Sequence, residues 1–214
     1  MDKVIARLLQ EYPVDILVVA CNTASTLTLP QLRSKLELSI VGVVPAIKPA
    51  AVRSNSRVIG LLATPATIAR PYTHELIREY AAGCEVISLG SSELVNIAEQ
   101  KLRGEAIDHA LIGRITEQLM SAPLATQMDF LVLACTHFPL LKDELMQHLP
   151  VGIQPIDSGE AIARRVASLL ADKMPVVTGA PEHTAVFTQA TEAARQLAPA
   201  LARFNIHQQH YLNI

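Results

Sequence analysis

The stretch Asp15-Ile16-Leu17-Val18-Val19-Ala20-Cys21-Asn22-Thr23 recurs later in the chain as Asp129-Phe130-Leu131-Val132-Leu133-Ala134-Cys135-Thr136-His137. In each copy a short apolar run lies between an aspartate and a cysteine. An apolar run without polar alternation is typical of a strand buried on both faces, as in a parallel sheet. Ligands of open parallel sheets bind beyond the carboxyl ends of the strands. Both cysteines are therefore expected to lie where a ligand binds.

Composition and charge narrow the class of protein. The chain has 214 residues, half of them hydrophobic, and a formal net charge of −2. Without a long basic run, nothing indicates nucleic acid or a membrane surface as a partner. No apolar stretch approaches the roughly 18–20 residues that a membrane-spanning helix needs. Three cysteines without paired spacing argue against a disulfide scaffold and indicate a reducing, cytoplasmic location.

Helix and strand patterns alternate along the chain, which implies parallel sheets covered by helices. The tail His207-Gln208-Gln209-His210 is expected to be solvated. Strands are predicted at residues 15–21, 40–44, 58–62, 84–89, 129–135, 153–157 and 184–187. Helices are predicted at residues 2–11, 28–36, 73–80, 93–101, 107–120, 140–148, 159–173 and 192–203.

The repeat extends beyond the two cysteine strands. In both halves the cysteine is followed by a polar turn, a helix that starts near a proline (Pro30 or Pro139) and another strand. We therefore expect an α/β fold of two pseudo-symmetric lobes, each a mostly parallel sheet flanked by helices. The first lobe is predicted to comprise residues 1–47 and 158–214, and the second residues 48–157.

Two thiols that face one ligand suggest proton transfer at carbon. An amino-acid α-proton is weakly acidic, so its removal needs a well-placed base and electrostatic stabilisation of the carbanion. A free thiol has a pKa of about 8.5, which nearby cations or dipoles lower, so cysteine serves both as thiolate base and as thiol acid. Inversion needs one of each on opposite faces of the carbon. The polar residues that directly follow the cysteines are candidates to bind carboxylates: Asn22, Thr23, Thr136 and His137.

Other interpretations of the cysteines, as structural residues or metal ligands, have less support. A cysteine at a strand end is often a small buried hydrophobe, and this reading fits Cys84, which has no polar neighbours of the same kind. Cys21, Cys135 and His137 are also a conceivable metal site, but the chain has no C-x-x-C spacing, so no metal is predicted. Neither a G-x-G-x-x-G nor a P-loop pattern occurs, which leaves nucleotide binding without local support.

Several motifs together resemble bacterial glutamate racemase, a member of the aspartate/glutamate racemase superfamily. Two cysteine signatures in this order are far more specific than either alone. The resemblance covers nearly the whole chain and weakens after about residue 175. It rests on the segments Val19–Ser25, Val41–Ala46, Gly60–Thr67, Ala134–Leu141 and Ile156–Gly159.

The resemblance implies a cofactor-independent enzyme that interconverts L- and D-glutamate, with Cys21 and Cys135 on opposite faces of the α-carbon. It implies that Thr64 and Thr67 help to hold a carboxylate, and that Glu99 supports the second catalytic pair. It further implies two α/β lobes with the site between them, a homodimer, and a cytoplasmic product that feeds peptidoglycan precursor synthesis.

The chain departs from the family at its start. Family members begin with a strand that leads into an Asp-Ser-Gly turn, followed later by a Pro-Tyr-Gly turn, whereas this chain opens at the helix before the first cysteine strand. The first lobe is therefore expected to be incomplete and the chain as written to be inactive or weak with glutamate. The alternatives are a non-catalytic fragment of the family and a racemase of a related amino acid.

Overall fold

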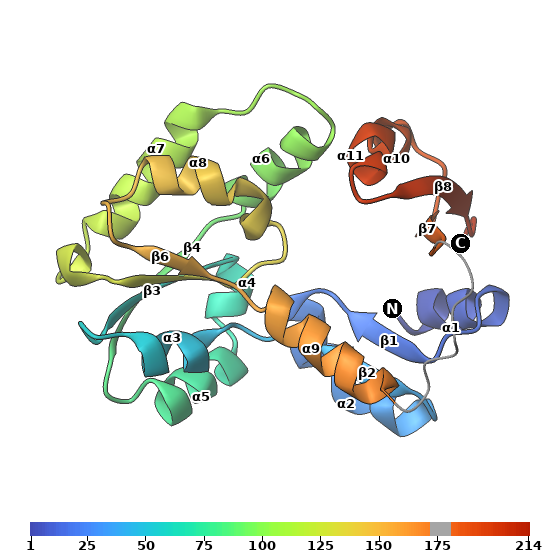
Figure 1. Cartoon of the computed structure of the whole chain (residues 1–214), viewed down its shortest axis with the longest axis horizontal. Coiled ribbons are helices and arrows are strands. Elements are labelled where there is room, and N and C mark those ends of the chain that lie inside the picture. Colours follow the sequence, from blue (N-terminus) through green and yellow to red (C-terminus); the bar gives the residue numbers. More distant parts are fainter. Residues whose placement is uncertain (172–180) are drawn as a thin grey trace.

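The computed structural model describes residues 1–171 and 181–214, which form parallel sheets flanked by helices (Figure 1). A four-stranded sheet has the order β4-β3-β5-β6, and two two-stranded sheets pair β1 with β2 and β7 with β8. All of these pairings are parallel, which confirms the predicted α/β class. The strands are β1 Ile16–Val19, β2 Ser39–Gly42, β3 Val58–Ala63, β4 Glu85–Gly90, β5 Phe130–Leu133, β6 Gln154–Ile156, β7 His183–Phe187 and β8 Ile206–Tyr211.

The helices lie between these strands and on both faces of the larger sheet (Figure 1). Short 3₁₀ turns occur at η1 Ala125–Gln127 and η2 Phe138–Leu141. In the described part of the chain, no helix is long and apolar enough to cross a membrane. The helices are α1 Asp2–Glu11, α2 Asn22–Lys35, α3 Ile47–Arg53, α4 Pro65–Ile68, α5 Pro71–Tyr80, α6 Glu93–Leu102, α7 His109–Met120, α8 Lys142–Gln147, α9 Gly159–Leu170, α10 Glu192–Gln196 and α11 Ala198–Ala202.

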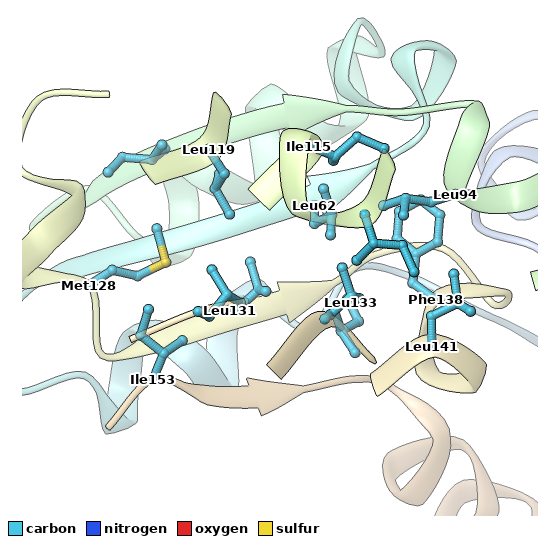
Figure 2. Packing of buried hydrophobic residues seen from close by; sticks show 14 of the residues in the cluster. Leu62, Leu94, Ile115, Leu119, Met128, Leu131, Leu133, Phe138, Leu141 and Ile153 are labelled. Atoms are coloured by element: carbon cyan, nitrogen blue, oxygen red, sulfur yellow. The ribbon is translucent and has the colours of Figure 1, made fainter. Parts of the chain in front are cut away.

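The four-stranded sheet is buried on both faces, as its apolar strands require. All six residues of β3 and all four of β5 are buried. Alternate residues of a strand point to opposite faces, so Leu62 packs with α6 and α7 while Leu61 packs with α3 on the other side. Figure 2 shows the first of these clusters, in which Leu94, Phe138 and Leu141 lie together. This core fixes the carboxyl ends of β3 and β5.

The β1–β2 sheet lies beside the larger sheet and is covered by α2 and α9 (Figure 1). Its small core joins Ile5, Val19, Leu32 and Ile40. The chain passes between the two sheets after β2 and again after β6, where the Ser158 hydroxyl donates a hydrogen bond to the carbonyl of Val44. The predicted lobe boundaries after residues 47 and 157 stay predictions.

The helix predicted at residues 28–36 begins earlier than expected, directly after Cys21. Threonines and serine dominate its first two turns and hide the apolar periodicity that marks a helix. Their hydroxyls bond back to the preceding turn instead, as Thr28 does to the carbonyl of Ala24 at 2.8 Å. Pro30 therefore lies inside α2 rather than at its start, so the prediction of a polar turn after Cys21 is wrong.

The C-terminal predictions also need correction. The helix predicted at residues 192–203 is two short helices, α10 and α11, and Pro199 lies in the first turn of the second. The tail predicted to be solvated is strand β8, which pairs with β7 even though His207 is exposed. Helix α9 ends at Leu170, and the predicted end at Lys173 lies outside the described residues.

Candidate active site

Cys21 follows β1 and forms the N-cap of α2. Its backbone is extended, and its sulfur accepts a hydrogen bond from the amide of Ala24 at 3.5 Å. The positive end of the helix dipole favours negative charge at this position. Cys21 is exposed, so the sulfur is accessible to a ligand.

Ser25 holds this N-terminus against both strands of the small sheet. The side chain is 1% exposed. Its hydroxyl donates to the carbonyl of Val19 at 3.0 Å and accepts from the amide of Val43 at 3.0 Å. One buried hydroxyl therefore ties the ends of β1 and β2 to the helix that Cys21 caps.

Cys135 occupies the corresponding position after β5. The amide of Ala134 still bonds to Leu62 of β3 at 2.8 Å, and the carbonyl of Cys135 accepts from the amide of Phe138 at 3.0 Å as the chain turns into η2. The sulfur lies 3.8 Å from Nδ1 of His137. Both thiols thus lie just beyond the carboxyl end of a parallel strand.

His137 lies between the Cys135 sulfur and a carboxylate on α6. Its Nε2 is 2.8 Å from Oε1 of Glu99. Hydrogen bonding to the Cys135 sulfur is the largest influence, and with the Glu99 carboxylate it outweighs partial burial and raises the pKa of His137 to about 9. The imidazole is therefore largely protonated at neutral pH, with its Nδ1 facing the Cys135 sulfur.

A chain of three hydroxyls joins the two sides of the site. Thr23 Oγ1, at the start of α2, lies 3.0 Å from Thr67 Oγ1, which in turn lies 3.0 Å from Thr64 Oγ1. Thr67 is 2% exposed, and its carbonyl accepts the Thr73 hydroxyl at 2.6 Å. A hydroxyl both donates and accepts, so this chain can reorient to hold an anionic ligand.

The two thiols, the His137 ring and the three linked threonines line a single pocket of about 250 Å³. Its walls also include Ala20, Val95 and Ala134. Oδ1 of Asn22, a residue only 5% exposed, accepts no hydrogen bond from the described residues. A buried amide oxygen without a partner is costly, so it is suited to accept from a ligand's ammonium group. The predicted site residues that line the pocket are Cys21, Asn22, Thr23, Thr64, Thr67, Cys135, Thr136 and His137.

Comparison with models of known protein families assigns the chain to one of them. The model of the Asp/Glu/Hydantoin racemase family matches residues 2–166. The chain belongs to the Asp/Glu/Hydantoin racemase family. Membership confirms the resemblance inferred from the two cysteine signatures, whereas the role of each site residue stays a prediction.

Individual members of the racemase family are close relatives. The glutamate racemase of Salmonella typhimurium is 48% identical over 202 residues, which are 94% of this chain and 71% of the relative. Escherichia coli glutamate racemase, solved in complex with L-glutamate and the activator UDP-MurNAc-Ala, is 44% identical with a TM-score of 0.89 over 97% of this chain and 77% of that one. A Bacillus anthracis glutamate racemase isoform has a TM-score of 0.76 at 25% identity, covering 97% of this chain and 76% of that one.

A second cavity of about 340 Å³ adjoins the pocket that the two thiols line, and Asn22, Cys135 and Thr136 line both. Asp157 and Ser158 line its other side, so the chain passage after β6 lies close to Cys135. The sequence identified this segment only as part of the resemblance, without a role. Ser25 was likewise part of a motif without an assigned function, because sequence cannot show that its hydroxyl bridges two strands.

No group of three or more histidine, cysteine, aspartate or glutamate side chains suited to a metal occurs in residues 1–171 or 181–214. Cys84, predicted to be structural, packs beside the core under α3 and α5. Its thiol is not among the groups that line the pocket.

Proposed function

We propose that this chain is a glutamate racemase that interconverts L- and D-glutamate through two cysteine bases, without a cofactor. The observation that carries the proposal is that Cys21 and Cys135 line the same pocket, each just beyond a parallel strand. Relatives about 48% identical over most of the chain are glutamate racemases.

The two thiols exchange one proton with the substrate in each turnover. A thiolate takes the α-proton from one face, the carbanion forms, and the opposite thiol gives its proton to the other face. The first sulfur ends as a thiol and the second as a thiolate, so the enzyme is then poised for the reverse reaction. The imidazolium of His137 stabilises the thiolate of Cys135, and the N-terminus of α2 does so for Cys21.

Substrate recognition falls to the polar groups around the thiols. Carboxylates accept from hydroxyls and backbone amides, and Thr64, Thr67 and Thr136 supply hydroxyls at the pocket wall. The ammonium group donates to the free Oδ1 of Asn22. The E. coli relative binds L-glutamate, which favours glutamate over aspartate as the substrate here.

Circular dichroism of L-glutamate over time, at matched protein concentration, tests the proposal. We expect Cys21→Ser and Cys135→Ser to abolish racemization, because an alcohol is a far weaker acid than a thiol, and Cys84→Ser to retain it. Exchange of the α-proton in deuterated water, followed by proton NMR for each enantiomer, should respond differently in the two active-site variants.

The same assay separates the alternatives. Full racemization by either active-site serine variant would count decisively against the two-base mechanism. A folded wild-type chain that exchanges no α-proton from glutamate would favour the non-catalytic reading. Faster turnover of aspartate than of glutamate would favour a related racemase.

The physiological setting is part of the same proposal. We infer that D-glutamate made in the cytoplasm supplies peptidoglycan precursors, and that the chain forms a homodimer, as the family resemblance implies. Light scattering after size exclusion measures the oligomeric state, and a mass of one 23.2 kDa chain would contradict the dimer. Turnover unchanged by prolonged dialysis against a chelator is expected if no metal takes part.

A further inference from the structure

Helix α6 contacts the segment after Cys135 at two points. Glu99 of α6 meets His137, as described above. One half-turn further, the ammonium group of Lys101 donates to the carbonyl of Leu140 at 2.7 Å and to Glu144, whose nearer oxygen lies at 2.7 Å. The Glu144 side chain is only 12% exposed but that of Lys101 is 37% exposed, so this second contact is partly shielded from water.

The Lys101 contact is connected to the thiol by a short run of backbone hydrogen bonds. The amide of Leu140 donates to the carbonyl of His137 at 3.1 Å, and the amide of Phe138 donates to the carbonyl of Cys135 at 3.0 Å. The first of these bonds closes the first turn of η2 and the second closes the turn just before it, and the hydrogen-bond geometry of such tight turns is poorer than that of an α-helix. An external anchor at Leu140 therefore matters for the placement of the residues before it.

We propose that Lys101 is a positioning residue for the Cys135–His137 pair, acting through the carbonyl of Leu140. This inference rests on the proposed racemase function and adds a residue that does not line the pocket. With Lys101 in place, η2 is held to the helix that carries Glu99, so the Glu99–His137 and His137–Cys135 contacts form together.

The charges around Lys101 fit a positioning role better than a purely stabilising one. Burial opposes ionisation of Glu144, but the hydrogen bonds from Lys101 and from the backbone, together with the charges of Lys101 and His109, outweigh it and hold the pKa of that carboxyl below its usual range. A partly exposed ion pair contributes little net stability, because solvent screening and desolvation offset the attraction. Such a pair instead holds its groups in one position, and here it holds the Lys101 ammonium against the backbone carbonyl of Leu140.

The test uses the full chain with Lys101→Met, the conservative Lys101→Arg, and Lys142→Met as a matched control, since Lys142 is an exposed lysine on the same segment. The first measurement is the NMR titration of the His137 ring, which does not depend on turnover. The others are kcat and KM for each glutamate enantiomer. If the methionine variant does not fold, Lys101→Gln, which keeps a polar group beside Glu144, replaces it.

We expect Lys101→Met to lower the pKa of His137 from about 9 by about one unit. It should also lower kcat by about 10- to 100-fold, since a displacement of about 1 Å costs on the order of 100-fold, with little change in KM. Lys101→Arg should recover most of both values, and Lys142→Met should match wild type.

A folded methionine or glutamine variant with an unmoved His137 titration and unchanged kcat would overturn the proposal, even if its thermal stability were lower. If the wild-type chain shows no measurable turnover, only the racemase activity of this chain is in question, and the His137 titration of the variants still decides the role of Lys101.

Discussion

Replacing Glu99 with glutamine removes the charge that acts on His137, along with the ion pair of 3.5 Å between Glu99 and Arg103. Oε1 of Glu99 lies 2.8 Å from Nε2 of His137, and the glutamine amide oxygen can accept the same hydrogen bond. The orientation of the imidazole is therefore kept while the negative charge is lost. Since this carboxylate is one of the groups that raise the pKa of His137 to about 9, the variant should lower that pKa.

The size of the effect follows from the kind of hydrogen bond. Bonds to charged groups contribute about 1.5–3 kcal/mol and neutral ones about 0.5–1.5 kcal/mol. The difference of about 1–1.5 kcal/mol corresponds to about one pKa unit. At pH 9 the protonated fraction of His137 then falls from about one half to about one tenth, whereas at pH 7 it stays above about nine tenths in both proteins.

Racemization by Glu99→Gln should therefore be about fivefold slower than wild type at pH 9 and close to wild type at pH 7, if the imidazolium supports the Cys135 thiolate. The assay is circular dichroism of each enantiomer from pH 6 to 10, with an NMR titration of His137 alongside. Glu99→Ala, which also removes the hydrogen bond, should be slower at every pH. An alkaline limb that stays near pH 9 in the glutamine variant would refute the reasoning.

Other predictions concern the scaffold. Asp129→Asn should cost about 1 kcal/mol at pH 7, since the partly exposed carboxylate accepts from the amides of Asn55 and Ser56. These bonds outweigh the burial of Asp129 and lower the pKa of its carboxyl. The stability that the carboxylate contributes is therefore present above about pH 4 and is lost as the pH falls through the folded pKa. Urea unfolding at several pH values measures this loss. Ser25→Ala leaves a buried amide unpaired and should cost about 1–3 kcal/mol by the same method. Leu94→Ala, at a site 0% exposed, should cost about 2–5 kcal/mol in thermal or urea unfolding without changing KM.

Sequence reasoning located the two thiols because the signal is local at both places. A continuous apolar run that ends on cysteine marks a buried strand and its carboxyl end, and the run repeats. The role of Thr64 and Thr67 in holding a carboxylate was predicted only from the family resemblance, since a threonine pair after a strand has no distinctive sequence pattern. That Thr67 bonds to Thr23 across the pocket depends on tertiary placement.

Sequence patterns failed where side-chain hydrogen bonds replace apolar periodicity. Helix α2 starts at Asn22 because Cys21 caps it and threonine hydroxyls bond within its first turns, so no apolar stripe marks its beginning. Strand β8 carries polar residues and half of its residues are exposed, so its sequence resembles a solvated tail. The contact between Lys101 and Leu140 joins residues far apart in the chain, and no local pattern could have indicated it.

The two chain passages after β2 and β6 have a consequence for how the site can move. Cys21 is fixed to the small sheet and Cys135 to the large one, and the two sheets meet where Ser158 bonds to Val44. Any relative movement of the two sheets would therefore strain this bond and the contact between the Thr23 and Thr67 hydroxyls, which spans the pocket at 3.0 Å. A substitution that removes either contact is expected to change the distance between the two sulfurs without disturbing the packing of either core.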